Sequence, residues 1–215
     1  MRVRDGRVYG ADGKFRDRDI CIENGRYAPE STDGREVNAS GLYVIPALTD
    51  IHMYGCLGHT LMDADEEALQ RMAEYEAGHG IANFVLSTAA APYPELRAAM
   101  ERGASYEKRQ GAYLKGLRLE GPFSSEAQAG AMNTAYLYEP DGQMVTKLGE
   151  AAGGLLRIVD AAPELPGALS MISGLREEYR FSIGHTACGY ETAVLGIQSG
   201  VSLITNLYED MPPML

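Results

Sequence analysis

The sequence predicts an α/β fold with a parallel sheet, and three observations support this prediction. From about residue 42 onward, short apolar runs alternate with stretches that have helical periodicity. The apolar runs lack a polar face, which is typical of strands that are buried on both sides in a parallel sheet. Glycines such as Gly78, Gly154 and Gly200 follow the helical stretches, and helices commonly stop at such positions.

The residues before this region predict a small β unit over residues 1–45. Strand-like pieces alternate there with turn residues, and apolar and polar residues alternate around Asn24-Gly25, which is a hairpin signal. A unit this short cannot hold a hydrophobic core by itself.

Residues 46–215 are expected to hold about six strands and five helices in alternation. We expect strands over 42–50, 81–89, 112–120, 155–164, 180–186 and 201–213, and helices over 65–78, 94–108, 140–152, 165–179 and 190–199. A closed (β/α)8 barrel takes about 250 residues. The pattern therefore fits either an open six-stranded sheet or about three-quarters of a barrel.

Length and composition limit the classes of function that this protein is expected to have. The 215 residues suffice for one large domain, or for a medium domain with a small appendage. The 30 acidic and 19 basic residues give a net charge of −11, which argues against nucleic acid or an anionic membrane surface as a partner. The 3 cysteines form no CxxC pair, and no apolar run reaches the ~18 residues of a membrane span. We therefore expect a soluble, cytoplasmic protein with reduced thiols.

Candidate functional residues stand where the predicted strands end. These are Asp50 and His52 at the end of the first strand, Glu120 at the end of the third, His185 at the end of the fifth and Asn206 in the sixth. Carboxyl ends of parallel strands meet at one edge of the sheet, and imidazole with carboxylate is the donor set of a divalent metal site. The alternative for His52 is a buried, hydrogen-bonded histidine, and for Asn206 a hydrogen-bonding role without ligation.

Four segments carry a resemblance to a known family. PALTDIHMYGCLG, LRLEGPFSSEAQAGAMN, SIGHTACGYETAVLGIQSG and ITNLYEDMPPM resemble, in order and spacing, the signature segments of the N-acetylglucosamine-6-phosphate deacetylases in the amidohydrolase superfamily. The resemblance implies an incomplete (β/α)8 TIM-type barrel over 46–215, preceded by part of a small β-sandwich over 1–45. It also implies a divalent metal, Zn or Fe, and the removal of acetate from an amino-sugar 6-phosphate.

The resemblance assigns metal-binding positions only in part. Glu120 stands at the family's metal-binding Glu, and His185 stands at its first metal-binding His. Asn206 replaces the second metal-binding His, and His52 is a further possible ligand from the first strand. An amide oxygen is a weaker ligand than imidazole for Zn or Fe, so metal is expected to bind weakly or not at all.

The expected substrate positions are also substituted. Met132 occupies the place of a substrate-contacting His, and Glu209 and Asp210 replace an Asn-Ala pair that helps hold the sugar phosphate. Two carboxylates are expected to repel a phosphate dianion. The family's catalytic Asp belongs beyond residue 215, so no catalytic residue is identified.

Two functions remain open at this point. The first is a deacetylase-like enzyme of amino-sugar catabolism that is weak or inactive as the chain stands. The second is a non-catalytic, degenerate paralogue, or a fragment of a longer reading frame, that acts as a binding or assembly partner. Because the first and sixth strands are expected to be open edges, we also expect a homo-oligomer.

Overall fold

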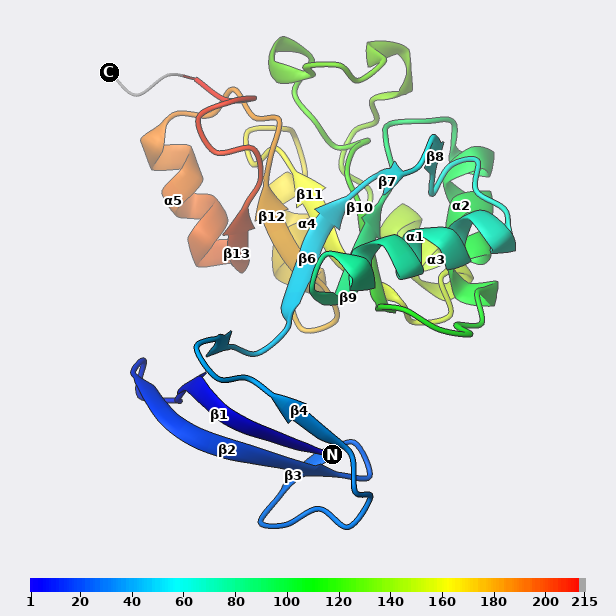
Figure 1. Ribbon diagram of the computed structural model, residues 1–215. Helices are drawn as coiled ribbons and strands as arrows, with labels where there is room; N and C mark the ends of the chain where they lie inside the picture. Colours follow the sequence, from blue (N-terminus) through cyan, green and yellow to red (C-terminus); the bar gives the residue numbers. More distant parts are fainter. Residues whose placement is uncertain (213–215) are drawn as a thin grey trace. The chain divides into compact units, whose positions relative to one another are not determined.

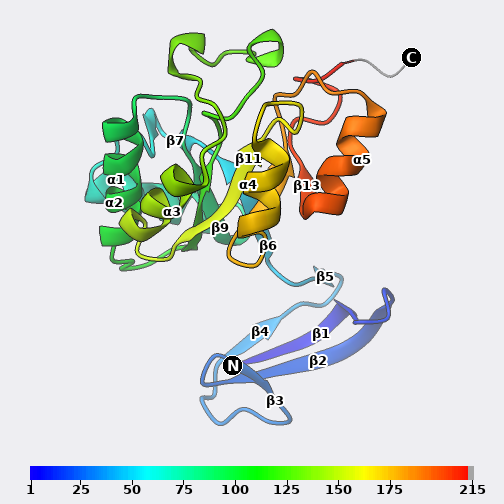
Figure 2. The same cartoon turned by 180° about the vertical axis from the view of Figure 1, so that it is seen from behind.

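The computed structural model describes residues 1–212, and the chain forms two compact units within it. The first is Met1–Ala47, and the second begins at Leu48. Figures 1 and 2 show both units from opposite sides. In the described part of the chain, no helix is long and apolar enough to cross a bilayer.

The first unit is a mixed sheet of short strands. Its strands are β1 (Arg2–Tyr9), β2 (Phe15–Glu23), β3 (Arg26–Ala28), β4 (Glu36–Asn38) and β5 (Tyr43–Val44). They are ordered β3-β2-β1-β4, and β5 also pairs with β1. Asn24 and Gly25 join β2 to β3 with φ values of 51° and 73°. Two successive positive φ values fit the tight hairpin turn that the Asn-Gly pair predicts, so the hairpin is confirmed.

The second unit contains a parallel sheet, which confirms the predicted α/β fold. Its strands are β6 (Leu48–Met53), β9 (Ile81–Ser87), β10 (Tyr113–Leu119), β11 (Leu156–Ala161), β12 (Arg180–Ile183) and β13 (Val201–Ile204). Their order is β13-β12-β11-β10-β9-β6, and all neighbours are parallel. A short hairpin of β7 (Gly55–Cys56) and β8 (His59–Thr60) was not predicted.

Five helices follow the strands, as expected. They are α1 (Glu66–Gly78), α2 (Tyr93–Ser105), α3 (Gly142–Ala151), α4 (Ala168–Leu175) and α5 (Tyr190–Ser199). Asp65 and Asp141 cap α1 and α3, because their carboxylates accept hydrogen bonds from the N–H groups of Ala68 and Gln143 at 2.8 Å. Short 3₁₀ turns, η1 (Glu126–Gln128) and η2 (Thr134–Tyr136), lie between β10 and α3.

Two expectations about the strands are wrong. The run over 42–50 does not form one buried strand, because Tyr43–Val44 belongs to the first unit and β6 begins only at Leu48. Pro46 lies between them, and proline cannot donate a ladder hydrogen bond. The sixth strand, expected over 201–213, ends at Ile204, and residue 213 lies outside the described residues.

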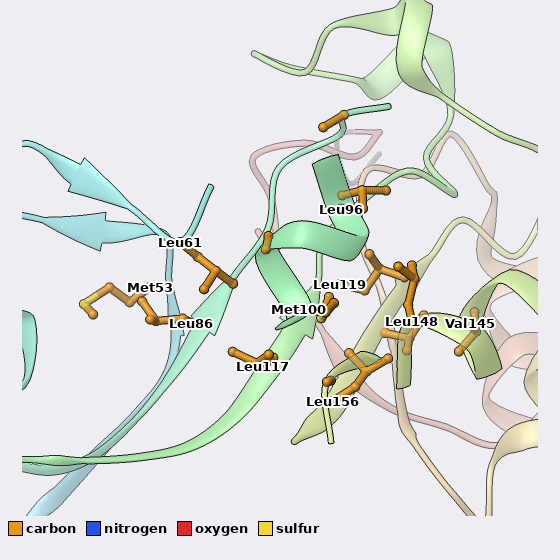
Figure 3. Close-up of a cluster of buried hydrophobic side chains, with 14 of the residues drawn as sticks. Met53, Leu61, Leu86, Leu96, Met100, Leu117, Leu119, Val145, Leu148 and Leu156 are labelled. Carbon is orange, nitrogen blue, oxygen red and sulfur yellow. The ribbon is translucent and has the colours of Figure 1, made fainter. Parts of the chain in front are cut away.

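The hydrophobic core lies between the helices and one face of the parallel sheet. Figure 3 shows that Leu86, Leu117 and Leu119 from the strands meet Leu96 and Met100 from α2. Alternate strand residues reach this core, as expected for side chains with a period of two. The intervening residues therefore face the other, inner side of the sheet.

The inner side carries a buried ion pair. Arg118 on β10 donates to both carboxylate oxygens of Asp160 on β11, at 2.7 Å each. Its guanidinium also donates to the hydroxyl of Thr205 after β13 and to the carbonyl oxygen of Ile51 on β6. Ser182 on β12 lies 2.6 Å from the Thr205 hydroxyl. This polar cluster therefore links five of the six strands in the sheet order.

We predict that Asp160→Ala lowers the free energy of unfolding by about 3–5 kcal/mol, because it leaves the buried Arg118 charge unpaired. Urea denaturation followed by circular dichroism measures this change. The matched control is Glu101→Ala, which removes the exposed partner of Arg97 and should change stability little. Replacing both partners, Arg118→Met with Asp160→Leu, should recover part of the loss. Equal stability of Asp160→Ala and the unmodified chain would contradict this prediction.

Candidate functional site

A buried carboxylate forms the centre of the candidate site. Glu120 directly follows β10, and its side chain is fully buried. One carboxylate oxygen accepts a hydrogen bond from Nε2 of His52 on β6. The other lies 3.1 Å from Nε2 of His185, which follows β12. The structure thus brings together Glu120, His52 and His185 from three strand ends, as the sequence pattern leads us to expect.

The pKa of Glu120 is determined by two opposed effects. Burial by itself raises the pKa of a carboxyl group, because it disfavours the charged form. The hydrogen bonds from His185 and His52 outweigh burial and lower the pKa from its ordinary 4.5 to about 2. Glu120 is therefore an anion at neutral pH.

His185 is held at both ring nitrogens. Its Nδ1 lies 3.0 Å from the carbonyl oxygen of Gln128 in η1, and its Nε2 faces the ionised Glu120. A carbonyl oxygen and a carboxylate can only accept, so both imidazole nitrogens are placed to donate. Burial lowers the pKa of His185, but the hydrogen bonds to Glu120 and Gln128 outweigh it, so its pKa is raised above the ordinary 6.5.

The backbone directs His185 and Asn206 into the site. Their φ values are 49° and 50°, in the left-handed region that non-glycine residues rarely adopt. His185 and Asn206 are each two residues past the end of a strand, and a left-handed residue there turns its side chain away from the strand's alternation. Such conformations cluster at functional sites, where the surrounding structure holds them in place.

The other residues predicted for the site differ in how they contact the Glu120 cluster. The Asn206 side chain lies 3.3 Å from His185 and donates to Asp210 at 3.0 Å. The thioether of Met132 lies against Gly121, next to Glu120. Glu209 is exposed, and its backbone N–H donates to the carbonyl oxygen of Asn206 at 2.9 Å.

The sequence does not predict two contacts of the cluster. The carbonyl of Gln128 gives no residue-type signal, because every residue carries one. The pKa of the Tyr54 phenol is raised. Burial is the largest cause, and the charge of the nearby Glu120 is the second. Tyr54 is two residues from His52, so strand alternation could have placed both on one face.

The donor atoms do not fit a metal ion as they are arranged. Within residues 1–212, no three His, Cys, Asp or Glu side chains form a group that could hold one. Nε2 of His52 and Nε2 of His185 both face the Glu120 carboxylate, and Nδ1 of His185 faces the Gln128 carbonyl oxygen, so these nitrogens point at protein oxygens and not at a shared ion position. The residue types suit a divalent metal, but the hydrogen bonds occupy their donor atoms.

Comparisons with known proteins point to one family, although no family model matches the chain. The chain is 27% identical over 219 residues to N-acetylglucosamine-6-phosphate deacetylase of Lysinibacillus sphaericus, a match that covers 98% of the chain and 57% of the relative. It is 31% identical to the Vibrio furnissii enzyme of the same name, covering 88% of the chain and 49% of the relative. The chain spans about half the length of the curated relatives it matches.

Solved structures agree with these matches. The crystal structure of N-acetyl-D-glucosamine-6-phosphate deacetylase from Mycobacterium smegmatis superposes with a TM-score of 0.88 at 26% identity. The superposition covers all of this chain and 58% of that one. The Thermotoga maritima enzyme has the same fold, with a TM-score of 0.83 at 22% identity. The six parallel strands of this chain form an incomplete TIM-type barrel that matches these structures. The chain is a homologue of the N-acetylglucosamine-6-phosphate deacetylases of the amidohydrolase superfamily and covers about half of their length.

Proposed function

We propose that the chain is a diverged relative of the amino-sugar 6-phosphate deacetylases whose Glu120 cluster is stabilised by hydrogen bonds without a metal. On this proposal, the 215 residues by themselves deacetylate an amino-sugar 6-phosphate weakly or not at all. The observation that carries the proposal is the pairing of one buried carboxylate with two imidazoles. An ion would have to displace both hydrogen bonds and a proton from His185.

The residues around the cluster support the same proposal. Asn206 offers a neutral amide, which binds Zn or Fe less strongly than imidazole does. Asp210 adds a second carboxylate within 3.7 Å of His185 Nδ1. The carboxylates of Asp210 and Glu120 would repel a phosphate dianion that approaches the cluster. Among the cluster residues, His185 is the one cation that would attract it.

A second candidate function has its own supporting observation. The outermost strands of the parallel sheet, β6 and β13, expose apolar side chains. Such edges favour pairing with another polypeptide. A non-catalytic binding or assembly role therefore remains a proposal beside weak catalysis.

The first prediction concerns metal content. Protein purified without chelator should contain little Zn or Fe, and Asn206→His should raise the affinity for Zn by more than about tenfold, because it adds an imidazole beside His185. Elemental analysis and competition with a zinc-binding dye measure both quantities. Asn24→His is the matched control, since it places an imidazole at an equally left-handed position, with φ of 51°, in the first unit. Near-stoichiometric metal in the unmodified protein would refute the proposal.

The second prediction concerns turnover. With added Zn²⁺, the 215-residue chain should release acetate from N-acetylglucosamine 6-phosphate or N-acetylgalactosamine 6-phosphate far more slowly than the ~1–10³ s⁻¹ of common enzymes. A coupled acetate assay measures the rate. A rate inside that range would show that the chain contains a base and a metal site that the hydrogen-bonded cluster does not account for.

The third prediction concerns pH. The pKa of Glu120 is lowered from 4.5 to about 2, so its contribution to stability is present above pH 4.5 and lost as pH falls toward 2. The pKa of His185 is raised above 6.5, so its contribution is complete below pH 6.5 and lost as pH rises through the raised value. The stability difference between the unmodified protein and Glu120→Gln should therefore be largest between these limits.

Urea titrations at several pH values measure that difference. Glu101→Gln, at an exposed carboxylate, serves as the control and should show no such maximum. A difference that does not change with pH would mean that Glu120 and His185 do not form a charged pair in the folded state.

A further inference from the structure

The loop that carries His185 joins two regular elements and has no regular structure of its own. It spans residues 184–189, from the end of β12 to the start of α5 (Figure 1). His185 is 3% exposed, and its φ of 49° is a value that non-glycine residues rarely adopt. Such a conformation persists only where neighbouring groups hold the backbone in place.

Glu164, in the turn after β11, holds this loop by two hydrogen bonds. One of its carboxylate oxygens accepts from the Thr186 hydroxyl at 2.5 Å, and the other accepts from the Ala187 N–H at 2.6 Å. The Thr186 hydroxyl in turn accepts from the Cys188 N–H at 3.0 Å. The three residues that follow His185 are therefore linked to one carboxylate. Hydrogen bonds to a carboxylate are stronger than those between neutral groups.

The other contacts of the loop lie before these three residues. The carbonyl oxygen of His185 accepts from the Ser125 N–H at 2.8 Å. Gly184 lies against Thr205, close enough that a Cβ atom on Gly184 would meet the Thr205 side chain at 2.8 Å. In the described part of the chain, Glu164 is the one side chain of another element that forms a hydrogen bond with the backbone of this loop. Loss of the Glu164 carboxylate would therefore free the segment after His185.

We propose that Glu164 is a positioning residue: by holding the next two residues of the loop, it keeps the His185 imidazole against Glu120. The proposal rests on the proposed function, since it takes the Glu120 cluster as the site. The ring nitrogens of His185 lie 3.1 Å from Glu120 and 3.0 Å from Gln128, so a small backbone rotation separates the ring from both oxygens. Without the Glu164 carboxylate, the backbone can relax toward a more common φ, which turns the His185 side chain away.

Two variants of Glu164 test the proposal. Glu164→Ala removes both hydrogen bonds, whereas Glu164→Gln keeps an oxygen that can accept from the Ala187 N–H and an amide that can donate to Thr186. In Glu164→Ala, the Ala187 amide should exchange about tenfold faster or more, because it loses a hydrogen bond to a charged group. At one fixed pH, ¹H–¹⁵N spectra of the imidazoles should show the His185 ring signals shifted toward those of a solvent-exposed ring. Glu164→Gln should leave both readouts close to those of the unmodified protein.

A control separates positioning of His185 from stabilisation of α5. Glu191→Ala removes an exposed carboxylate in the first turn of α5 and should leave the His185 ring signals unchanged. Thr186→Val removes one of the two bonds to Glu164, so it should shift the same signals by less, and it provides the test if Glu164→Ala does not fold. Unchanged His185 signals in the folded Glu164→Ala or Thr186→Val protein, or an equal shift in Glu164→Gln or in Glu191→Ala, would overturn the proposal.

Failure of this proposal and failure of the proposed function give different results. Metal content, measured on the same samples, tests the proposed function. Near-stoichiometric Zn or Fe would refute that function, and the Ala187 exchange rates in the Glu164 variants would still decide whether Glu164 holds the loop. A metal-free protein with the same His185 ring signals in the presence and absence of the Glu164 carboxylate would refute the positioning role alone.

Discussion

The Arg118–Asp160 ion pair is the interaction on which the rest of the second unit depends. Arg118 lies on β10 and Glu120 directly follows that strand, two residues later, so both face the same inner side of the sheet. The ion pair joins the neighbouring strands β10 and β11 beneath the site, and the hydroxyl of Thr205, which follows β13, bonds to both of its members. Burying these charges is costly unless their hydrogen bonds are satisfied, and the bidentate geometry satisfies them. The register of these strands in turn decides which side chains reach Glu120.

Above this ion pair, one carboxylate serves two imidazoles. In a metal centre the same three side chains would direct their donor atoms at a shared ion. Here the Glu120 carboxylate accepts a hydrogen bond from His52 and lies 3.1 Å from Nε2 of His185. The carbonyl oxygen of Gln128 lies against Nδ1 of His185. The metal-bound and the hydrogen-bonded arrangement of these side chains would differ in a few protons and not in the fold. We propose that the amide of Asn206, at a position where the resemblance implies a metal-binding His, shifts the balance from metal binding toward hydrogen bonding.

The sequence predicts some of these features and not others, for physical reasons. The hairpin at Asn24-Gly25 and the helix stops depend on local backbone preferences, so a local pattern reveals them. Glu120 and His185 were found because parallel strand ends converge. The ion pair joins residues 42 apart, and the Gln128 contact joins a carbonyl to a residue 57 further on. Neither leaves a local pattern, and Pro46 shows how one apolar run can be divided between two units.

The most direct test of this account is the protonation of the histidine rings in protein purified without chelator. Two-bond ¹H–¹⁵N correlation spectra distinguish a protonated ring nitrogen from one that carries a lone pair or a metal. With 4 histidines in the chain, His59 and His79, which lie outside the cluster, serve as internal references. The account predicts that both nitrogens of His185 are protonated at pH 6. An unprotonated or metal-bound Nε2 of His185 would contradict it.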